Sequence, residues 1–139
     1  MIIGLSSCKS PMQRWLDSMT DFAEVKGNAY KIQAARITTG IEDTTTLNYK
    51  VRIYLGKAVT SKGYDESVNF YYHMDSCFLV RTMGGNELPV LVQPVNNGIS
   101  GCYEYLVSMD ISKAMRLKKL ELIYQDKFID GKRYILNLN

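Results

Sequence analysis

The residues with the clearest potential for chemistry stand near the start of the sequence. Leu5-Ser6-Ser7-Cys8 follows the short apolar run Met1-Ile2-Ile3-Gly4. An apolar residue, two small residues and a cysteine form the pattern before whose cysteine bacterial lipoprotein signal peptidases cut. The small side chains fit a narrow protease subsite, and the thiol is the nucleophile that accepts a diacylglyceryl group. We therefore expect lipidation at Cys8, with residues 1–8 as the remnant of a lipoprotein signal.

This signal is shorter than a complete one. A secretory signal has a positively charged start and an apolar stretch of about 7–15 residues, whereas no Lys or Arg precedes Cys8. Either the sequence begins at an internal methionine of a longer signal, or the match is accidental and the protein is cytosolic. The position of the motif, after an apolar run and before polar residues, favours the lipoprotein interpretation.

The remaining candidates for chemistry do not form a recognisable catalytic set. His73 is the sole histidine. Cys77 would lie about 13 Å from it along a strand, which is beyond hydrogen-bond reach unless the chain turns at Asp75-Ser76. The acidic residues Asp75 and Glu104 can be assembled into catalytic pairs only by free choice, and no HExxH, P-loop or GxSxG motif occurs. We expect no enzymatic activity, no cofactor and no metal site.

Cys77 and Cys102 remain as an even pair if Cys8 is lipidated. In an oxidising envelope compartment the two can form a disulfide. The alternative is two buried free thiols that behave as small hydrophobic side chains. Spacing alone does not decide between them, because a bridge requires Cα atoms closer than about 7 Å.

Length and composition indicate one domain over residues 9–139. The chain has 139 residues, 46% of them hydrophobic, and a formal net charge of +3. This charge is small and scattered, so nucleic acid is not an expected partner. No stretch approaches the roughly 18 apolar residues of a membrane span. Any membrane attachment would therefore pass through Cys8.

One amphipathic helix is expected at the N-terminus, over residues 11–25. Ser10 and Gln13 have the spacing of a capping box, with Pro11 in the first turn. Gly27 provides a C-terminal stop. Apolar residues recur at helical spacing between these ends: Met12, Trp15, Leu16, Met19, Phe22 and Ala23.

From about residue 29 the hydrophobic period changes to two, which is typical of half-buried strands. Gly84-Gly85-Asn86 and Asp130-Gly131 indicate hairpin turns, and a short helix is possible over 111–117. The expected fold is mainly β, an antiparallel β-sandwich of immunoglobulin or transthyretin type behind the N-terminal helix. The expected strands are Tyr30–Ala34, Leu47–Leu55, Val68–Met74, Cys77–Met83, Leu88–Val95, Tyr103–Met109, Leu120–Tyr124 and Arg133–Leu138.

Two of the ten tyrosines are candidates for a binding surface. Tyr54 and Tyr71 fall on the polar side of their expected strands. An exposed tyrosine offers apolar area and a hydroxyl at low entropic cost, which suits contact with protein or sugar. The alternative is that tyrosine occurs there because it is a favourable strand residue.

The chain resembles the small β-sandwich lipoproteins of Bacteroidetes-type bacteria. The resemblance rests on Leu5-Ser6-Ser7-Cys8, a short helix, and strands such as Leu47–Leu55 and the final Tyr134–Asn139. Val51–Leu55 is also similar to a strand in the outer-membrane lipoprotein of type VI secretion systems, a β-sandwich of similar size behind a lipidated cysteine. Lys9 after the cysteine resembles the pattern of lipoproteins sent to the outer membrane.

These observations predict a non-catalytic protein that is lipid-anchored in the outer membrane, on its periplasmic or surface face. It would act by binding an envelope protein, within a secretion or surface assembly. A carbohydrate- or small-ligand-binding sandwich is the alternative, and it would require an aromatic cluster on one concave face.

Overall fold

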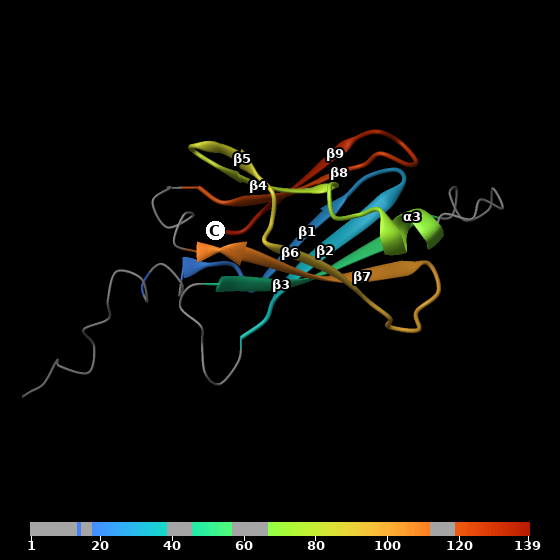
Figure 1. Cartoon of the computed structure of the whole chain (residues 1–139), viewed down its shortest axis with the longest axis horizontal. Helices are drawn as coiled ribbons and strands as arrows, with labels where there is room; N and C mark the ends of the chain where they lie inside the picture. The colour runs from blue at the N-terminus through green and yellow to red at the C-terminus, as the bar shows by residue number, and fades with distance from the viewer. Residues whose placement is uncertain (1–13, 15–17, 39–45, 57–66, 112–118) are drawn as a thin grey trace, which may run out of the picture.

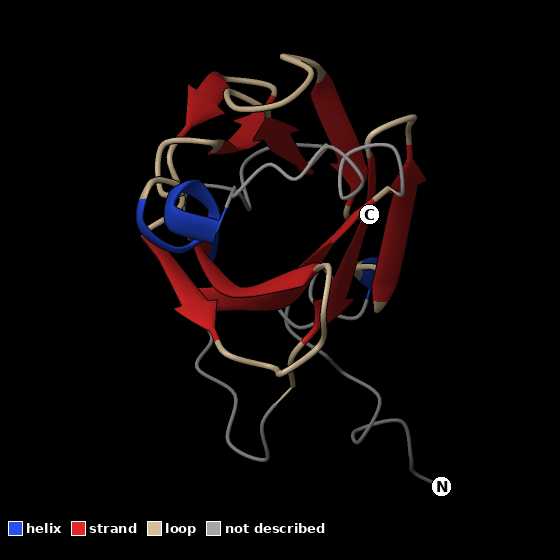
Figure 2. Cartoon of the chain, turned by 90° about the vertical axis from the view of Figure 1, so that its right-hand side faces the viewer, coloured by secondary structure: helices blue, strands red, loops and turns tan. Residues whose placement is uncertain are grey.

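The computed structural model describes residues 14, 18–38, 46–56, 67–111 and 119–139. They form two antiparallel sheets packed face to face, so the prediction of an antiparallel β-sandwich is confirmed (Figures 1 and 2). The five-stranded sheet has the order β1 (Phe22–Lys26), β2 (Tyr30–Arg36), β3 (Thr46–Leu55), β7 (Cys102–Asp110) and β6 (Leu91–Val95). The four-stranded sheet has the order β5 (Gly85–Glu87), β4 (Phe78–Thr82), β8 (Glu121–Gln125) and β9 (Arg133–Asn137).

Strand β3 is the centre of the larger sheet, and its alternating pattern sets the register. Leu47, Tyr49, Val51 and Ile53 are buried, whereas Lys50 is exposed, as the sequence predicts. β3 pairs with β2 on one side and with β7 on the other. Because side chains alternate between faces along a strand, this register also directs Tyr105 and Val107 of β7 into the core.

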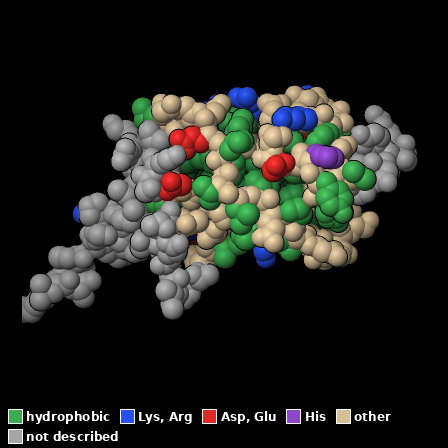
Figure 3. All heavy atoms as spheres, viewed as in Figure 1, with side chains coloured by type: hydrophobic (Ala, Val, Ile, Leu, Met, Phe, Trp, Pro, Cys, Tyr) green, Lys and Arg blue, Asp and Glu red, His purple; other side chains and the backbone are tan. Residues whose placement is uncertain are grey.

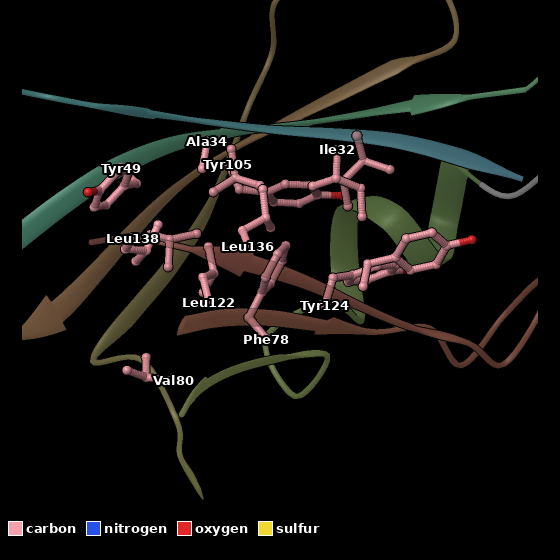
Figure 4. Close-up of a cluster of buried hydrophobic side chains, with 14 of the residues drawn as sticks. Ile32, Ala34, Tyr49, Phe78, Val80, Tyr105, Leu122, Tyr124, Leu136 and Leu138 are labelled. Carbon is pink, nitrogen blue, oxygen red and sulfur yellow. The ribbon is translucent and has the colours of Figure 1, made fainter. Parts of the chain in front are cut away.

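The core between the sheets is rich in aromatic side chains. Tyr30, Tyr105 and Phe78 come from both sheets and are almost fully buried. Figure 4 shows the side chains of β2, β3 and β7 meeting those of β4, β8 and β9. The rings of Tyr30 and Tyr124 meet edge to face with centroids 5.6 Å apart, an arrangement that adds about 0.5–1.5 kcal/mol beyond burial.

The predicted helix over 11–25 is wrong at its C-terminal end. Phe22–Lys26 is strand β1, which pairs with β2. Ala23 and Val25 pack against the core, while the side chains between them are exposed, so the period here is two. Phe22 and Ala23 follow Met19 at helical spacing, which is why the sequence favoured the helix, whereas in the strand Phe22 is exposed. Of the earlier part of the predicted helix, only Arg14 and residues from Ser18 onward lie within the described residues.

The predicted strand over Val68–Met74 is also wrong, because helix α3 (Ser67–Tyr72) takes its place. The N–H of His73 donates to the carbonyl of Asn69 at 2.9 Å, which is helical bonding. Phe70 and Met74 are both buried. Four-residue spacing places side chains on one face of a helix as well as on one face of a strand, so the alternating pattern fitted both.

The chain after β4 differs from the expected hairpin. β4 does turn back at Met83-Gly84, and Gly85 has a positive φ of 127°. Strand β4 pairs with the three-residue β5 rather than with a strand over 88–95. Residues 88–90 then connect to the other sheet, where β6 pairs with β7. The residues of a hairpin turn predict that the chain reverses there, but they do not predict which sheet the following strand joins.

The hairpin predicted at Asp130-Gly131 is confirmed as the connection between β8 and β9. The two strands pair from Glu121–Asn137 to Gln125–Arg133, and Gly131 has a φ of 67°, a left-handed conformation that favours glycine. The connecting loop covers residues 126–132. The short helix predicted at 111–117 falls outside the described residues, apart from Ile111.

One side of the sandwich is closed and the other is open. β1 contacts β9 across the sheets, and the N–H of Thr20 donates to the carbonyl of Leu138 at 2.8 Å. On the opposite side the sheets end at β6 and at the short β5. Only the connection over residues 88–90 joins these two edges, so this side is where the described part of the domain offers inter-sheet surface.

Candidate functional site: an exposed apolar strip

Cys8 and residues 1–8 lie outside the described residues. Lipidation at Cys8 and the division of the chain at that point therefore stay predictions.

The structure exposes His73, at the end of α3, and fully buries the Cys77 thiol. The thiol donates to the backbone carbonyl of His73, with sulfur and oxygen 3.7 Å apart. Burial raises the pKa of Cys77. A thiol that is buried and held protonated lacks the reactivity of a catalytic cysteine.

Cys77 and Cys102 are both buried and free. Cys77 belongs to the core between the sheets. Cys102 pairs with Tyr54 in the sheet register, which places it on the outer face of the five-stranded sheet. Its sulfur accepts a hydrogen bond from the Asn97 amide at 3.4 Å. Of the two alternatives for this pair, the structure has the free thiols.

Two buried glutamates are held in ion pairs with arginines. Glu104 is buried against Arg52, with a nitrogen–oxygen distance of 2.7 Å. Glu121 has the same arrangement with Arg81, also at 2.7 Å. Within the described ranges, no three His, Cys, Asp or Glu side chains gather in a way that would hold a metal ion.

The structure does not bring Tyr54 and Tyr71 together. Tyr54 lies on the outer face of β3, where the Lys31 ammonium sits 4.6 Å from its ring centroid. Tyr71 lies on α3, and its ring meets that of Tyr103 edge to face at 5.3 Å. Tyr103 pairs with core-facing Ile53, so the two candidate tyrosines are on opposite faces of the sheet.

Helix α3 lies at one end of the sandwich (Figure 1) and carries Phe70, Tyr71 and Tyr72. Phe70 anchors it, because its buried ring stacks on Tyr103 with centroids 4.7 Å apart. The hydroxyl of Tyr105 also donates to the carbonyl of Phe70. On the outward side Val68, Tyr71 and Tyr72 are exposed, Tyr72 to 77%. The anchor fixes the backbone from which these side chains project.

More exposed apolar side chains follow on the open side of the sandwich. We define the apolar strip as the exposed hydrophobic residues of α3 and the 88–90 connection. Figure 3 shows hydrophobic side chains gathered along the middle of this face and around the histidine. The apolar strip consists of Val68, Tyr71, Tyr72, Leu88 and Val90. Single exposed apolar residues are ordinary, whereas a gathered set marks an interaction surface.

The free edge of β6 is protected against strand addition. The N–H of Leu55 donates to the carbonyl of Gly101 at 2.9 Å. Because backbone groups along a strand point alternately to its two neighbours, the odd-numbered residues of β7 hydrogen-bond to β3 and the even-numbered residues hydrogen-bond to β6. In β6, the residues opposite these even-numbered positions are Leu91, Gln93 and Val95, and their backbone N–H and C=O groups point toward β7. Val92 and Pro94 therefore face the free edge, and Pro94 has no N–H to offer. Proline is one of the usual devices that stop edge-to-edge pairing.

The best-connected polar side chain in the described structure is Asp126, whose partners sequence reasoning did not predict. It is 2% exposed. One carboxylate oxygen accepts the hydroxyls of Tyr30 at 2.7 Å and Tyr124 at 2.9 Å. The other accepts the N–H groups of Ile129, Asp130 and Gly131 at 2.6–2.9 Å. The only sequence signal was an acidic residue five positions before the loop glycine.

Asp126 is a structural carboxylate rather than an acid–base group. Burial raises its pKa, but the hydrogen bonds from Tyr30 and from the loop N–H groups outweigh this effect. The net result is a pKa well below the usual range, so the side chain is an anion at neutral pH. Burial and the same anion raise the pKa of Tyr30 and Tyr124 well above ordinary values. The network ties β2, β8 and the 126–132 loop together.

Comparisons with known proteins find no matching protein family, no matching curated protein and no matching solved structure. Among the helices of the described residues, none has the length and apolar character needed to cross a bilayer.

Proposed function

We propose that this chain is a non-catalytic cell-envelope protein that is lipid-anchored at Cys8 and acts by binding another protein. In this proposal an immunoglobulin- or transthyretin-like sandwich stands at the outer membrane as a component of a secretion or surface assembly. The anchor rests on the sequence motif Leu5-Ser6-Ser7-Cys8. The binding function rests on the apolar strip.

The apolar strip is the single observation that carries the binding function. Its members come from α3 and the 88–90 connection, and all project to solvent. Burying apolar surface lowers the free energy by about 25 cal/mol for each Å² removed from water, and side chains left in solvent do not gain this stabilisation. Two of the members are tyrosines, a residue type that is enriched in protein interfaces and among their energetic hot spots. A protein partner would remove this surface from water.

A carbohydrate or small-ligand site has less support. It would require aromatic rings gathered on one concave face, and Tyr54 and Tyr71 lie on opposite faces of the sheet. We therefore retain protein binding as the proposed function.

The anchor is tested by detergent partitioning. Expressed with its full natural signal, the wild-type protein should partition into the detergent phase, because a thioether-linked diacylglyceryl group is strongly apolar. Cys8→Ala should move to the aqueous phase, while the buried-thiol variant Cys77→Ala, as a matched control, should stay with the wild type. Equal partitioning of wild type and Cys8→Ala would contradict the anchor.

The binding surface is tested by replacing exposed members of the apolar strip. In membranes solubilised in mild detergent, the wild-type protein should migrate in an assembly larger than the protein alone. Leu88→Ser with Tyr72→Ser should shift most of it to the mass of the free protein, because truncated interface anchors typically cost about 2 kcal/mol or more each. Lys132→Ser with Arg133→Ser replaces exposed side chains away from the strip and should migrate like wild type. Wild-type migration of the strip variant would argue against this surface.

A further inference from the structure

A hollow on the outer face of the five-stranded sheet forms around one small side chain. In the sheet register, Phe22 of β1 stands opposite Ala35 of β2, and Ala35 stands opposite Lys50 of β3. Because Ala23 and Val25 pack against the core, this row lies on the face that points away from it. The alanine side chain ends at its β-carbon, and a hollow of about 210 Å³ opens between its longer neighbours.

Most of the surface that lines this hollow is apolar. The Phe22 ring, which is 53% exposed, forms one side, and Ala35 lies between it and the opposite side. Pockets that hold free small ligands usually measure about 300–1,000 Å³, and this hollow is smaller. Its size therefore fits a single side chain that another protein presents.

The polar residues of the next row are already engaged. Gln33 and Arg52 also line the hollow. The Gln33 amide donates to the Glu24 carboxylate at 3.0 Å, and the Arg52 Nε donates to the Glu104 carboxylate at 2.7 Å. Both side chains are therefore held in place, and the charge of Arg52 is balanced within the sheet.

The Lys50 ammonium is the charge that stays unbalanced at the hollow. Lys50 is exposed, and among the described residues no carboxylate lies within ion-pair distance of it. Complementary charge across an interface adds specificity and a faster encounter more than raw affinity. An apolar group that enters the hollow is therefore selected best when a carboxylate lies beside it.

We propose that the hollow binds a segment of a partner protein in which an apolar side chain stands next to an aspartate or glutamate. The apolar side chain packs on Phe22 and Ala35, and the adjacent carboxylate pairs with Lys50. The hollow lies on the outer face of β1, β2 and β3, whereas the apolar strip lies on α3 and the 88–90 connection. The inference therefore goes beyond the proposed function and adds a second contact surface.

The test is a selection of displayed random heptapeptides on the purified full-length protein. The wild type should enrich peptides with an apolar residue next to Asp or Glu. For a selected peptide, Lys50→Gln should raise the dissociation constant about two- to fivefold, the effect of losing one exposed ion pair. Added salt should weaken binding to the wild type and have little effect on binding to Lys50→Gln. Lys132→Gln, the same change at an exposed position in the β8–β9 loop, should bind like the wild type.

The apolar part of the hollow is tested separately. Ala35→Leu fills the hollow and keeps the charge of Lys50, so it should abolish binding of the same peptide. Phe22→Ser removes one side of the hollow and should weaken binding. Both positions face away from the core, and circular dichroism checks that each variant remains folded.

Two results would overturn the hollow proposal. One is no enrichment, or a selected peptide whose affinity Lys50→Gln and Ala35→Leu both leave unchanged. The other is a wild-type protein that dimerises in sedimentation and becomes monomeric with Ala35→Leu, since this would place a second copy of the chain in the hollow. The strip variant Leu88→Ser with Tyr72→Ser should bind the peptide like the wild type, so failure of the hollow and failure of the strip are separate results.

Discussion

Val51→Asp should leave the domain unfolded at neutral pH. Val51 is fully buried at the centre of β3, with strands paired on both sides. The substitution places a carboxylate in the aliphatic and aromatic core between the sheets, where the described residues bury no Lys or Arg. A buried and unpaired charge costs several kcal/mol, which is a large fraction of the 5–15 kcal/mol typical of a whole domain.

The matched control is Lys50→Asp, the same new side chain one position earlier. Lys50 is exposed, so we expect a change within about 0.5 kcal/mol, as is usual for surface substitutions. Near-ultraviolet circular dichroism and urea unfolding measure both variants. A cooperative transition with the wild-type midpoint in Val51→Asp would mean that the register of β3 is wrong.

Asp126→Asn should have the next largest effect. We expect the free energy of unfolding to fall by about 2–5 kcal/mol, because each buried donor left unsatisfied costs about 1–3 kcal/mol. The native carboxylate accepts hydrogen bonds from two tyrosine hydroxyls and from the loop N–H groups. An asparagine can offer only one carbonyl oxygen, and its NH₂ group would face donors. Urea unfolding at neutral pH gives the difference.

The same carboxylate should make wild-type stability depend on acid. Its folded pKa lies below the unfolded value of about 3.9, so its contribution is fully present above that value and is lost as pH falls toward the folded pKa. We expect wild-type stability to fall more steeply than that of Asp126→Asn between about pH 5 and 2. Asp75→Asn, which removes an exposed carboxylate, should keep the wild-type slope. Parallel curves for wild type and Asp126→Asn would remove Asp126 from this role.

The sequence predicts best those strands whose hydrophobic pattern fits a strand but not a helix. In β3, alternation of buried and less buried residues from Leu47 to Ile53 fits a half-buried strand and no helical face, and in β7 the apolar residues Tyr103, Tyr105, Val107 and Met109 recur at every second position. Tyr49, Val51, Tyr105 and Val107 are buried as that alternation requires. The β8–β9 connection was equally readable, because Asp130-Gly131 is a strong turn signal between two apolar runs.

The errors occur where a short pattern fits two structures. Phe70 and Met74 lie on one face of a helix or of a strand, so α3 was taken for a strand. Phe22–Lys26 is too short for its period to exclude a helix, and pairing with β2 decides it. The candidate surface was incomplete for the same reason. Tyr71 was correctly expected to be exposed, but Leu88 and Val90 were assigned to a strand, and their exposure follows from the crossing between sheets.

Asp126 was unpredictable for a different reason. Its partners Tyr30 and Tyr124 come from different sheets, one of them 96 positions away in the sequence. No local spacing encodes such a meeting. Long-range networks of this kind are visible only once both sheets are in place.

The central claim, that the apolar strip contacts a protein in the native envelope, is tested most directly by site-specific photo-crosslinking in the cells that produce the protein. A photoreactive phenylalanine analogue is placed at Tyr72 or Leu88 of the strip, or at the exposed control position Lys132. Irradiation should give one and the same discrete protein adduct from Tyr72 and Leu88, and none from Lys132. Adducts of equal yield from all three positions, or none from the strip, would contradict the account.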